Sequence, residues 1–196
     1  MWQKLKHKFF GWFHHQLQIV QKRNRNQYHK VLKTKLAYCG AGVRFNGDIN
    51  INTPEQAHIE DNVHIGHGAF IHAKGGLFIG ANTHISRNLV LYTASHNYLG
   101  ERLPYDETYR EKPVHIGRNV WIGMNVCIAP GTIIEDGAII GIGTVVYGTI
   151  PSLAIVGASS WVQINSRDAT HYQRLEVEGR YGGSNGMPMD DTTAQE

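Results

Sequence analysis

Aliphatic residues recur every six positions along the second half of the chain. The row consists of Ile116, Ile122, Ile128, Ile134, Ile140 and Val146. An earlier row with the same period, which slips by two residues at Gly75–Gly76, runs through Ile59, Ile65, Ile71, Ile79, Ile85 and Leu91. We expect Val43 and Ile49 to begin it. A period of six fits neither the roughly 3.6-residue period of a helix nor the alternation of a simple strand.

A six-residue period is typical of a solenoid in which each hexad forms one short strand and one turn. The aliphatic side chain points inward, and the small residue that usually follows it lets the chain bend. Three hexads complete one triangular coil of about 18 residues, and stacked coils bury a continuous aliphatic core. We therefore predict an all-β fold, a parallel β-helix. The alternative is a β-sandwich with accidental spacing, and six consecutive positions in register argue against it.

Three segments depart from the rhythm and define the expected domains. Residues 1–38 form a basic segment with helical spacing, and residues 39–165 form the β-helix. Within the β-helix, residues 97–113 are charged and irregular, so we expect them to project as a loop. Residues 166–196 form a C-terminal extension, whose end, rich in glycine and polar residues, is predicted to be disordered.

The positive charge of the protein is concentrated at its N-terminus. Residues 1–47 contain ten lysines and arginines and no acid, although the net charge of the whole chain is only +3. On the predicted helix, one side carries most of the apolar residues, namely Trp2, Leu5, Phe9, Trp12, Phe13, Ile19 and Val20. Two interpretations stay open for residues 1–37: a cap on one end of the β-helix, or peripheral contact with anionic lipid. The acidic remainder argues against nucleic acid.

The two cysteines indicate a reducing compartment. Cys39 and Cys127 follow no pairing or metal-binding spacing, which favours a cytoplasmic location over a disulfide framework. No apolar run approaches the roughly 20 residues of a spanning helix. We expect a cytoplasmic protein that can lie at the inner face of the membrane.

Among twelve histidines, His96 has a distinctive position. It ends the regular rhythm, in the stretch "LYTASHNY", immediately before the predicted loop. His72 should lie on the same face one coil away, and Gly75–Gly76 should leave room for a substrate beside the imidazole. A histidine has an unperturbed pKa of about 6.5, so its neutral form can accept a hydroxyl proton near neutral pH. Position alone does not separate this role from that of a surface histidine.

"LYTASHNY" and residues 113–157, "PVHIGRNVWIGMNVCIAPGTIIEDGAIIGIGTVVYGTIPSLAIVG", closely resemble the hexapeptide-repeat O-acetyltransferases. This family includes the galactoside and maltose acetyltransferases and a polysaccharide and colanic acid branch, and the resemblance covers roughly residues 40–160. It implies a left-handed β-helix and transfer of an acetyl group from acetyl-CoA to a hydroxyl, by direct attack. The basic N-terminus resembles the polysaccharide branch. The resemblance therefore implies a sugar acceptor in surface polysaccharide or lipopolysaccharide assembly.

The resemblance also assigns roles to residues. His96 matches the general base, and Trp121 matches the tryptophan that lines the CoA groove between subunits of a homotrimer. With it we place Gly123, Gly141, Gly143 and Tyr147 at the cofactor site, and His72, Asn97 and Tyr98 at the acceptor. Two departures affect the CoA phosphates, because Tyr147-Gly148 stands where the family has Thr-Lys and Trp161 replaces a basic residue. Candidate substitutes are Arg167, Arg174 and Arg180.

Two other functions stay open. "HGAFIH", residues 67–72, has the spacing of two zinc ligands in the gamma-class carbonic anhydrases, which share this solenoid. A third histidine at the required distance is missing, since His58 and His64 are too close and His29 precedes the repeat, so no metal is expected. The other possibility is a β-helix scaffold without catalysis, which the altered CoA positions favour.

Overall fold

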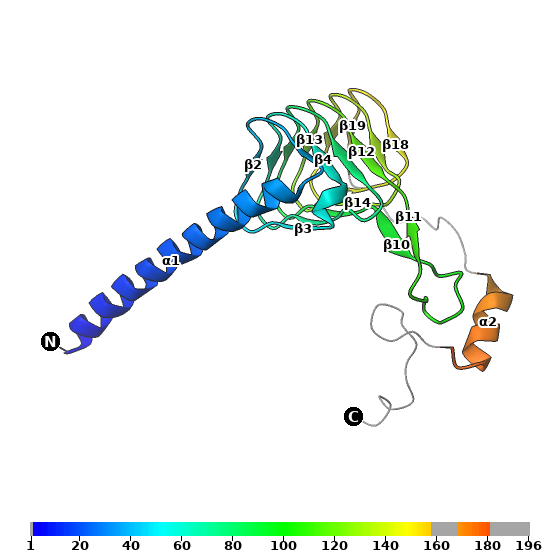
Figure 1. The fold of residues 1–196 in the computed structure, drawn as a ribbon, viewed down its shortest axis with the longest axis horizontal. Helices are drawn as coiled ribbons and strands as arrows, with labels where there is room; N and C mark the ends of the chain where they lie inside the picture. The colour runs from blue at the N-terminus through cyan, green and yellow to red at the C-terminus, as the bar shows by residue number, and fades with distance from the viewer. Residues whose placement is uncertain (1, 158–167, 181–196) are drawn as a thin grey trace.

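The computed structural model describes residues 2–157 and 168–180, and for residues 2–9 the backbone alone. The chain forms a parallel β-helix with three sheets (Figure 1). The first sheet contains β1 (Tyr38–Cys39), β4 (Ala57–Ile59), β7 (Leu77–Ile79), β12 (Val114–Ile116), β15 (Ile133–Ile134) and β18 (Thr149–Ile150). The second contains β2 (Arg44–Phe45), β5 (His64–Ile65), β8 (His84–Ile85), β13 (Trp121–Ile122), β16 (Ile139–Ile140) and β19 (Ile155–Val156). The third contains β3 (Asn50–Asn52), β6 (Phe70–His72), β9 (Val90–Tyr92), β14 (Cys127–Ile128) and β17 (Val145–Val146).

The predicted aliphatic rows form the core. The six residues of the later row are all buried, and Ile116 and Ile122 are completely inaccessible. One detail of the earlier row was wrong. Phe45 pairs with Ile65, so Phe45 and not Val43 begins that column. Ile51 likewise takes the place expected for Ile49, because it pairs with Ile71. Val43 and Ile49 are also buried, at a second inward position two residues earlier in each coil.

Coil length varies more than the hexad rule predicts. Trp121 pairs with Ile139, which is the expected step of one 18-residue coil. In the earlier coils His64 pairs with His84, so these coils are two residues longer. The additional residues lie at corners, one of which contains the short 3-10 helix η1 (Pro54–Gln56). Corner insertions leave the register of the buried strands intact.

Asparagines form several of the corners. Asn62, Asn82, Asn88 and Asn125 all have a positive φ, a conformation that asparagine tolerates better than most residues. Their amides also join neighbouring coils, since Asn62 donates to Asn82 at 3.0 Å and Asn88 donates to Asn125 at 3.0 Å. These corners therefore add side-chain hydrogen bonds along the solenoid to the backbone pairing.

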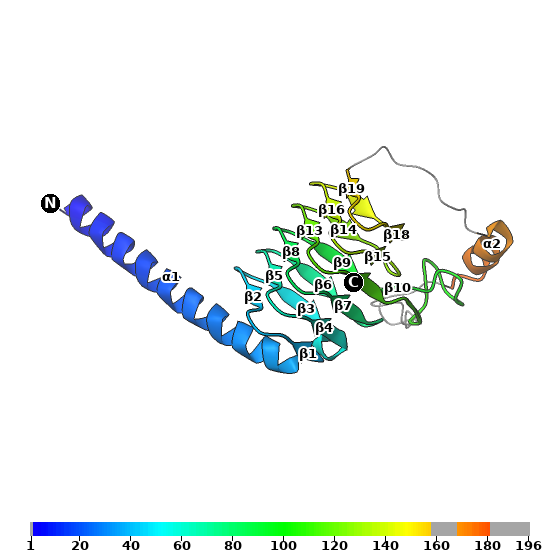
Figure 2. The ribbon, with the colours of Figure 1, turned by 90° about the horizontal axis from the view of Figure 1, so that it is seen from above.

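The predicted N-terminal helix is α1 (Trp2–Lys35), and only its C-terminal part packs on the solenoid. Leu32 and Leu36 are buried in the main core, and His29 packs edge-on against Phe45. The His29 ring also bonds to the carbonyl of Gly47 at 2.9 Å. The rest of α1 extends away from the β-helix (Figures 1 and 2). The cap interpretation therefore holds for the last turns of α1 and leaves the remainder unexplained.

The predicted projecting loop is an arm that begins earlier than expected. β10 (Ala94–His96) and β11 (Tyr109–Glu111) form an antiparallel hairpin, in which His96 is paired with Tyr109. Inside its loop, the Asp106 carboxylate accepts hydrogen bonds from the backbone of Glu101 and from Thr108. Burial acts to raise the pKa of Asp106, but these hydrogen bonds outweigh it and the pKa is lowered. The arm is thus an ordered element, defined here as residues 94–111.

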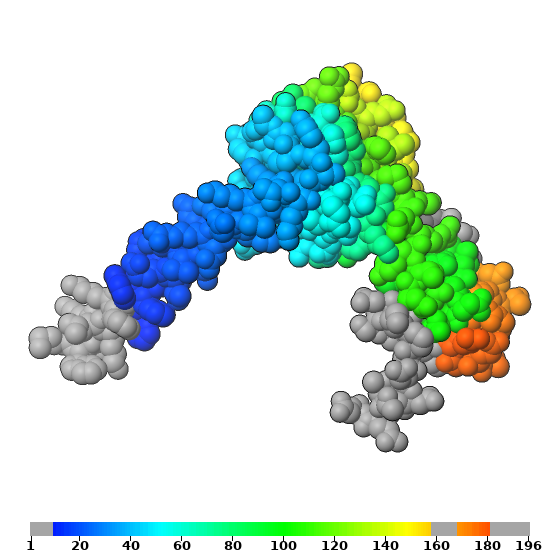
Figure 3. Space-filling model, in the orientation of Figure 1, coloured from blue at the N-terminus to red at the C-terminus, as the bar shows by residue number. Residues whose placement is uncertain are grey.

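A C-terminal helix, α2 (Ala169–Val177), packs on this arm (Figures 1 and 3). Leu175 is completely buried, and Leu103 of the arm is 3% exposed. His171 bonds to the carbonyl of Gly100 at 2.9 Å, and Arg174 pairs with Glu101 at 3.0 Å. The predicted domain boundary at residues 165–166 and the tail from residue 181 lie outside the described residues. Among the described helices, none combines the length and the apolarity needed to cross a bilayer.

Candidate active site

The imidazole of His96 lies between two tyrosines of the arm. Its ring stacks on Tyr105, with centroids 3.8 Å apart and planes inclined by 14°. Tyr109 contacts it at 4.5 Å with an inclination of 35°. Tyr109 is placed there by the hairpin register, because it is directly opposite His96. The arm therefore holds the histidine in one orientation by stacking on its ring.

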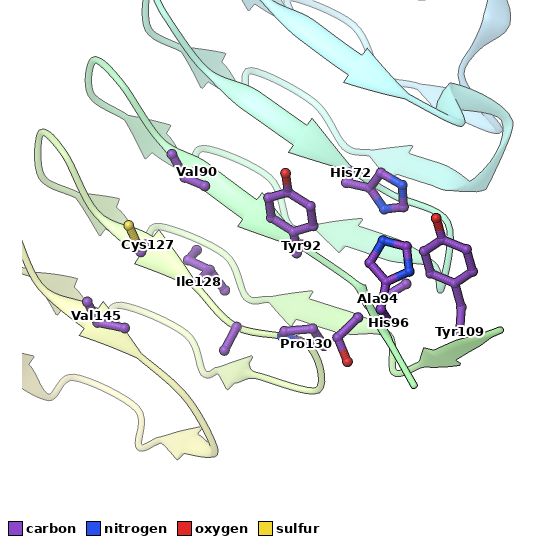
Figure 4. A pocket seen from close by; sticks show the side chains of 12 residues that line it. His72, Val90, Tyr92, Ala94, His96, Tyr109, Cys127, Ile128, Pro130 and Val145 are labelled. Atoms are coloured by element: carbon purple, nitrogen blue, oxygen red, sulfur yellow. The ribbon is translucent and has the colours of Figure 1, made fainter. Parts of the chain in front are cut away.

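His96 opens into a cavity of about 550 Å³ on the outer side of the third sheet. We call it the His96 cavity. It is lined by His72, Val90, Tyr92, Ala94, Ser95, His96, Tyr109, Cys127, Ile128, Ala129, Pro130 and Val145. Figure 4 shows the rings of His72, His96 and Tyr109 grouped at one end, with Val90, Cys127 and Val145 at the other. One end thus offers imidazoles and a phenol, and the other offers an apolar wall.

His72 is brought to this cavity as the sequence predicts. It ends β6, and its ring stacks on Tyr92 of the next coil at 5.4 Å and 15°. Register explains the stack, because β6 pairs with β9 so that His72 is opposite Tyr92. Tyr92 is 39% exposed and presents an aromatic surface beside the histidine. Such a surface suits the apolar side of a sugar ring.

The two histidines share a second property. Within the described part of the chain, the only buried side-chain nitrogen or oxygen atoms without a hydrogen-bond partner are Nδ1 of His72 and Nδ1 of His96. A buried polar atom left unpaired costs about 1–3 kcal/mol. Both atoms belong to residues that line one cavity, so the unsatisfied polar groups of the described chain are concentrated at this site.

The prediction that Gly75–Gly76 leaves room for substrate was wrong. A Cβ at Gly75 would lie 2.2 Å from the carbonyl oxygen of Thr93 and 2.9 Å from the nitrogen of Lys112. The Gly75 N–H also donates to the Thr93 hydroxyl at 2.7 Å. The glycine lets the base of the arm approach the coil below, and the space is filled by backbone.

Asn97 and Tyr98, predicted at the acceptor, do not line the His96 cavity. The Asn97 side chain donates to the Thr108 hydroxyl at 3.1 Å and accepts from the N–H of Leu99 at 3.2 Å. Tyr98 lies beneath the guanidinium of Arg110 at 5.6 Å. In this single chain, therefore, both residues shape the arm.

Trp121 and the other predicted cofactor residues lie elsewhere on the chain. Trp121 is on the second sheet, 56% exposed, and lines a separate cavity of about 490 Å³. We call this the Trp121 cavity. Gly123 and Gly141 follow Trp121 and Ile139 at the next corner of their coils, and Tyr147 is exposed beyond β17. One chain therefore does not bring the predicted base and the predicted cofactor residues together.

The predicted cofactor glycines also have structural roles. A Cβ at Gly123 would lie 2.8 Å from the nitrogen of Ile142 and 2.9 Å from the carbonyl oxygen of Ile140, so close stacking of coils requires glycine there. Gly143 has a φ of +70°, which favours glycine at its corner. Their occurrence in the sequence is explained by the solenoid whether or not they bind a cofactor.

The candidate arginines for the CoA phosphates are engaged in ion pairs. Arg174 contacts Glu101 at 3.0 Å and Glu178 at 3.3 Å, and Arg180 contacts Glu178 at 3.3 Å. Arg174 therefore joins α2 to the arm, whereas the Arg180 side chain pairs within the C-terminal segment. Arg167 and Trp161 lie outside the described residues.

The two histidines of the zinc-like motif are separated. His67 lines the Trp121 cavity, whereas His72 lines the His96 cavity. The Nδ1 atom of His67 accepts the backbone N–H of Asp48 at 2.9 Å. Among the described residues, no group of three or more histidines, cysteines or acids could hold a metal ion.

The bacterial transferase hexapeptide family model (six repeats) matches residues 113–148. Residues 113–148 therefore consist of repeats of this hexapeptide type. Repeats of this kind indicate a left-handed winding, so the predicted fold class is confirmed. A comparison with curated proteins found no match.

Solved structures of acetyltransferases are similar to this chain. A maltose O-acetyltransferase from Clostridium difficile 630 is 27% identical with a TM-score of 0.59, over 66% of this chain and 69% of that one. A galactoside acetyltransferase in complex with coenzyme A is 24% identical with a TM-score of 0.52, over 71% of each chain. A hexapeptide-repeat acetyltransferase from Vibrio cholerae is 22% identical with a TM-score of 0.57, over 68% of this chain and 76% of that one. The last two show the shared fold.

Sequence reasoning missed the aromatic residues around the two histidines. Tyr92 directly follows the inward Leu91, so the six-residue period already marks it as outward. Tyr105 and Tyr109 carry no such signal. Their contact with His96 depends on the antiparallel register of the arm, which the irregular stretch does not reveal.

Proposed function

We propose that the protein is an acetyl-CoA-dependent O-acetyltransferase that acts on a sugar hydroxyl. The observation that carries the proposal is the single cavity that His72 and His96 line together with the exposed ring of Tyr92. The hexapeptide repeat and the fold shared with the maltose O-acetyltransferase support the transferred group and the donor.

In this proposal His96 is the general base. Its neutral imidazole takes the proton of the acceptor hydroxyl while that oxygen attacks the thioester carbonyl. A carbon–oxygen bond forms, the carbon–sulfur bond breaks, and the proton returns to the departing CoA thiolate. Tyr105 and Tyr109 keep the ring oriented during this transfer. His72 and Tyr92 hold the sugar, the first by a hydrogen bond and the second by its exposed ring.

We place the complete site between two chains of a homotrimer. Within one chain His96 and Trp121 line different cavities, so a site that uses both needs a second copy. Trp121, Gly123, Gly141, Gly143 and Tyr147 of one copy would then line the donor groove that faces His96 of its neighbour. Asn97 and Tyr98, which lie near the base of the arm, would contact the acceptor in that assembly.

We further propose that α1 contacts the inner face of the membrane. Phe13 and Val20 are exposed, and at about 100° per residue they lie about 130° around the helix from Leu32 and Leu36, which pack on the solenoid. The apolar stripe is therefore separate from the capping face. Because residues 1–47 contain no acid, neighbouring copies of this helix would repel one another, whereas anionic lipid would attract them. Such a location suits assembly of a surface polysaccharide or lipopolysaccharide.

Acetyl transfer to a panel of sugars, followed by thiol release from acetyl-CoA, tests the enzymatic proposal. We expect turnover with at least one sugar and a loss of roughly 10²–10⁴-fold in kcat for His96→Ala. The matched control is His115→Ala, because His115 is an exposed histidine on the first sheet. Equal activity of His96→Ala and wild type would refute the role of His96.

Calorimetry with acetyl-CoA separates the enzyme from the scaffold. Binding of acetyl-CoA by the wild type, with reduced binding by Trp121→Ala, supports the transferase. A chain that binds no acetyl-CoA and shows no sugar-dependent thiol release would instead be a scaffold.

A further inference from the structure

The outward residues of the second sheet form one continuous row. Strand register aligns, coil by coil, Arg44, His64, His84, Trp121, Ile139 and Ile155. On one side of Trp121 the row carries a guanidinium and two imidazoles. On the other side it carries only isoleucine. Trp121 therefore stands at the boundary between a basic half and an aliphatic half.

The Trp121 cavity opens on the basic side of this boundary. Its described lining consists of Asn46, His64, Gly66, His67, His84, Ile85, Ser86, Arg87, Trp121 and Met124. Three imidazoles and one guanidinium thus line it, and no carboxylate is among these residues. Asp48 lies at the same corner, but its carboxylate is paired with Arg25 of α1 at 3.6 Å.

The hydrogen bonds of His64 and His67 show which N–H donors remain for a ligand. Nδ1 of His67 accepts the backbone N–H of Asp48, so the proton of this ring is on Nε2. The Nε2 atom of His64 faces the amide nitrogen of Asn46 at 2.7 Å, which leaves the proton of that ring on Nδ1. Each ring therefore keeps one N–H donor, and Arg87 adds an exposed guanidinium. A donor-rich, cationic lining suits an anion.

We infer that the Trp121 cavity binds an anionic group, a phosphate ester in particular. Binding of an anion does not depend on the proposed function. The identity of the molecule that carries the phosphate does rest on the proposed function. The phosphate can belong to the CoA donor or to a sugar phosphate acceptor. The aliphatic half of the row, with Ile139 and Ile155, remains available for an apolar part of a ligand.

The protonation of His64 is expected to change when an anion binds. Burial lowers the pKa of His64, and the charges of His84 and Arg44 lower it further, so the ring is neutral at pH 7. A bound anion would favour the protonated ring. The titratable and charged groups around it are Arg44 and His84 on the same sheet and His67 and Arg87 at the corner. Binding of an anion should therefore take up protons and be tighter at pH 6 than at pH 8.

Titration calorimetry of the full chain with inorganic pyrophosphate tests the inference. We expect saturable binding that weakens about tenfold in Arg87→Gln, the scale of one charge-assisted hydrogen bond. His84→Gln should weaken it comparably. The matched control is Arg118→Gln, because Arg118 is an exposed arginine paired with Asp136 at another corner. No binding, or equal binding by Arg87→Gln and wild type, would overturn the inference.

Two further titrations identify the source of the anion. The first compares CoA with dephospho-CoA. If the wild type binds CoA more tightly than dephospho-CoA, and Arg87→Gln binds the two with equal affinity, the cavity is assigned to the donor. Glucose 1-phosphate that binds more tightly than glucose, with the difference lost in Arg87→Gln, assigns it to the acceptor. Pyrophosphate binding without acetyl transfer would leave the anion site standing and refute only the proposed reaction.

Discussion

The ring of His96 is stacked on the ring of Tyr105, with centroids only 3.8 Å apart. The two residues come from different parts of the arm, so the conformation of the arm and the orientation of the imidazole are coupled. Because α2 packs on the same arm, the C-terminal extension is connected to the candidate base through Leu103 and Leu175. A change at the contact between α2 and the arm should therefore reach the ring of His96.

Tyr105→Leu should lower kcat about tenfold, because a base that is free to rotate spends less time in the reactive orientation. The KM for acetyl-CoA should not change. Tyr105→Phe keeps the aromatic face and should restore most of the activity. Steady-state kinetics on the three proteins would check this, and equal kcat for Tyr105→Leu and wild type would contradict a positioning role.

His72→Ala should raise the KM for the sugar about tenfold, since the variant loses one hydrogen bond to the acceptor. The KM for acetyl-CoA should stay the same. His58→Ala serves as the control, because His58 stacks between Tyr38 and Phe78 on another sheet. An unchanged sugar KM in His72→Ala would remove this residue from the acceptor site.

Leu175→Ala should release the arm from α2. Removing a completely buried leucine side chain typically costs about 2–5 kcal/mol of local stability. Hydrogen exchange should become faster in residues 97–108, and kcat should fall. Arg174→Ala should have a smaller effect, because its ion pairs are exposed and screened by solvent. Unchanged exchange in Leu175→Ala would show that α2 does not stabilise the arm.

Acid should destabilise the fold through His29. Burial lowers its pKa, an effect that Arg25 and Lys33 increase and that the hydrogen bond with Gly47 only partly offsets. The unfolded chain therefore binds the proton more readily than the folded chain. The contribution of His29 to the free energy of unfolding is therefore fully present above the unfolded pKa of about 6.5. It is lost as the pH falls below that value.

Urea unfolding at pH 7.5 and pH 5.5 would measure this effect. His29→Gln cannot titrate, so it should lose less stability between the two values than the wild type does. His15→Gln, an exposed position of α1, should behave like the wild type. An identical loss in His29→Gln would contradict the assignment.

Vesicle sedimentation would test the membrane proposal. The chain should bind vesicles that contain anionic lipid, and binding should weaken at high salt because the attraction is electrostatic. The double variant Phe13→Ser/Val20→Ser should bind several-fold less, whereas Tyr38→Ser, an exposed aromatic of the solenoid, should not change binding. Equal binding to neutral vesicles would contradict an electrostatic contribution.

The amino-acid sequence alone is enough to predict the solenoid. A six-residue period is a local pattern, and each hexad repeats the same buried aliphatic residue and the same corner. The six-residue period therefore predicted the fold class and the placement of His72 on the face of the His96 cavity. The helical spacing of residues 1–37 separately predicted the long basic helix. The resemblance of "LYTASHNY" and "VWIG" added the roles of His96 and Trp121, which stay proposals.

The surroundings of these residues, in contrast, depend on contacts between distant segments of the chain. Tyr105 and Tyr109 reach His96 through an antiparallel register that irregular sequence does not encode visibly. Gly75 meets the base of the arm instead of a substrate. His96 and Trp121 line separate cavities of one chain. The physical reason is that these contacts join segments without a common period, and their geometry depends on how the arm and the coils pack.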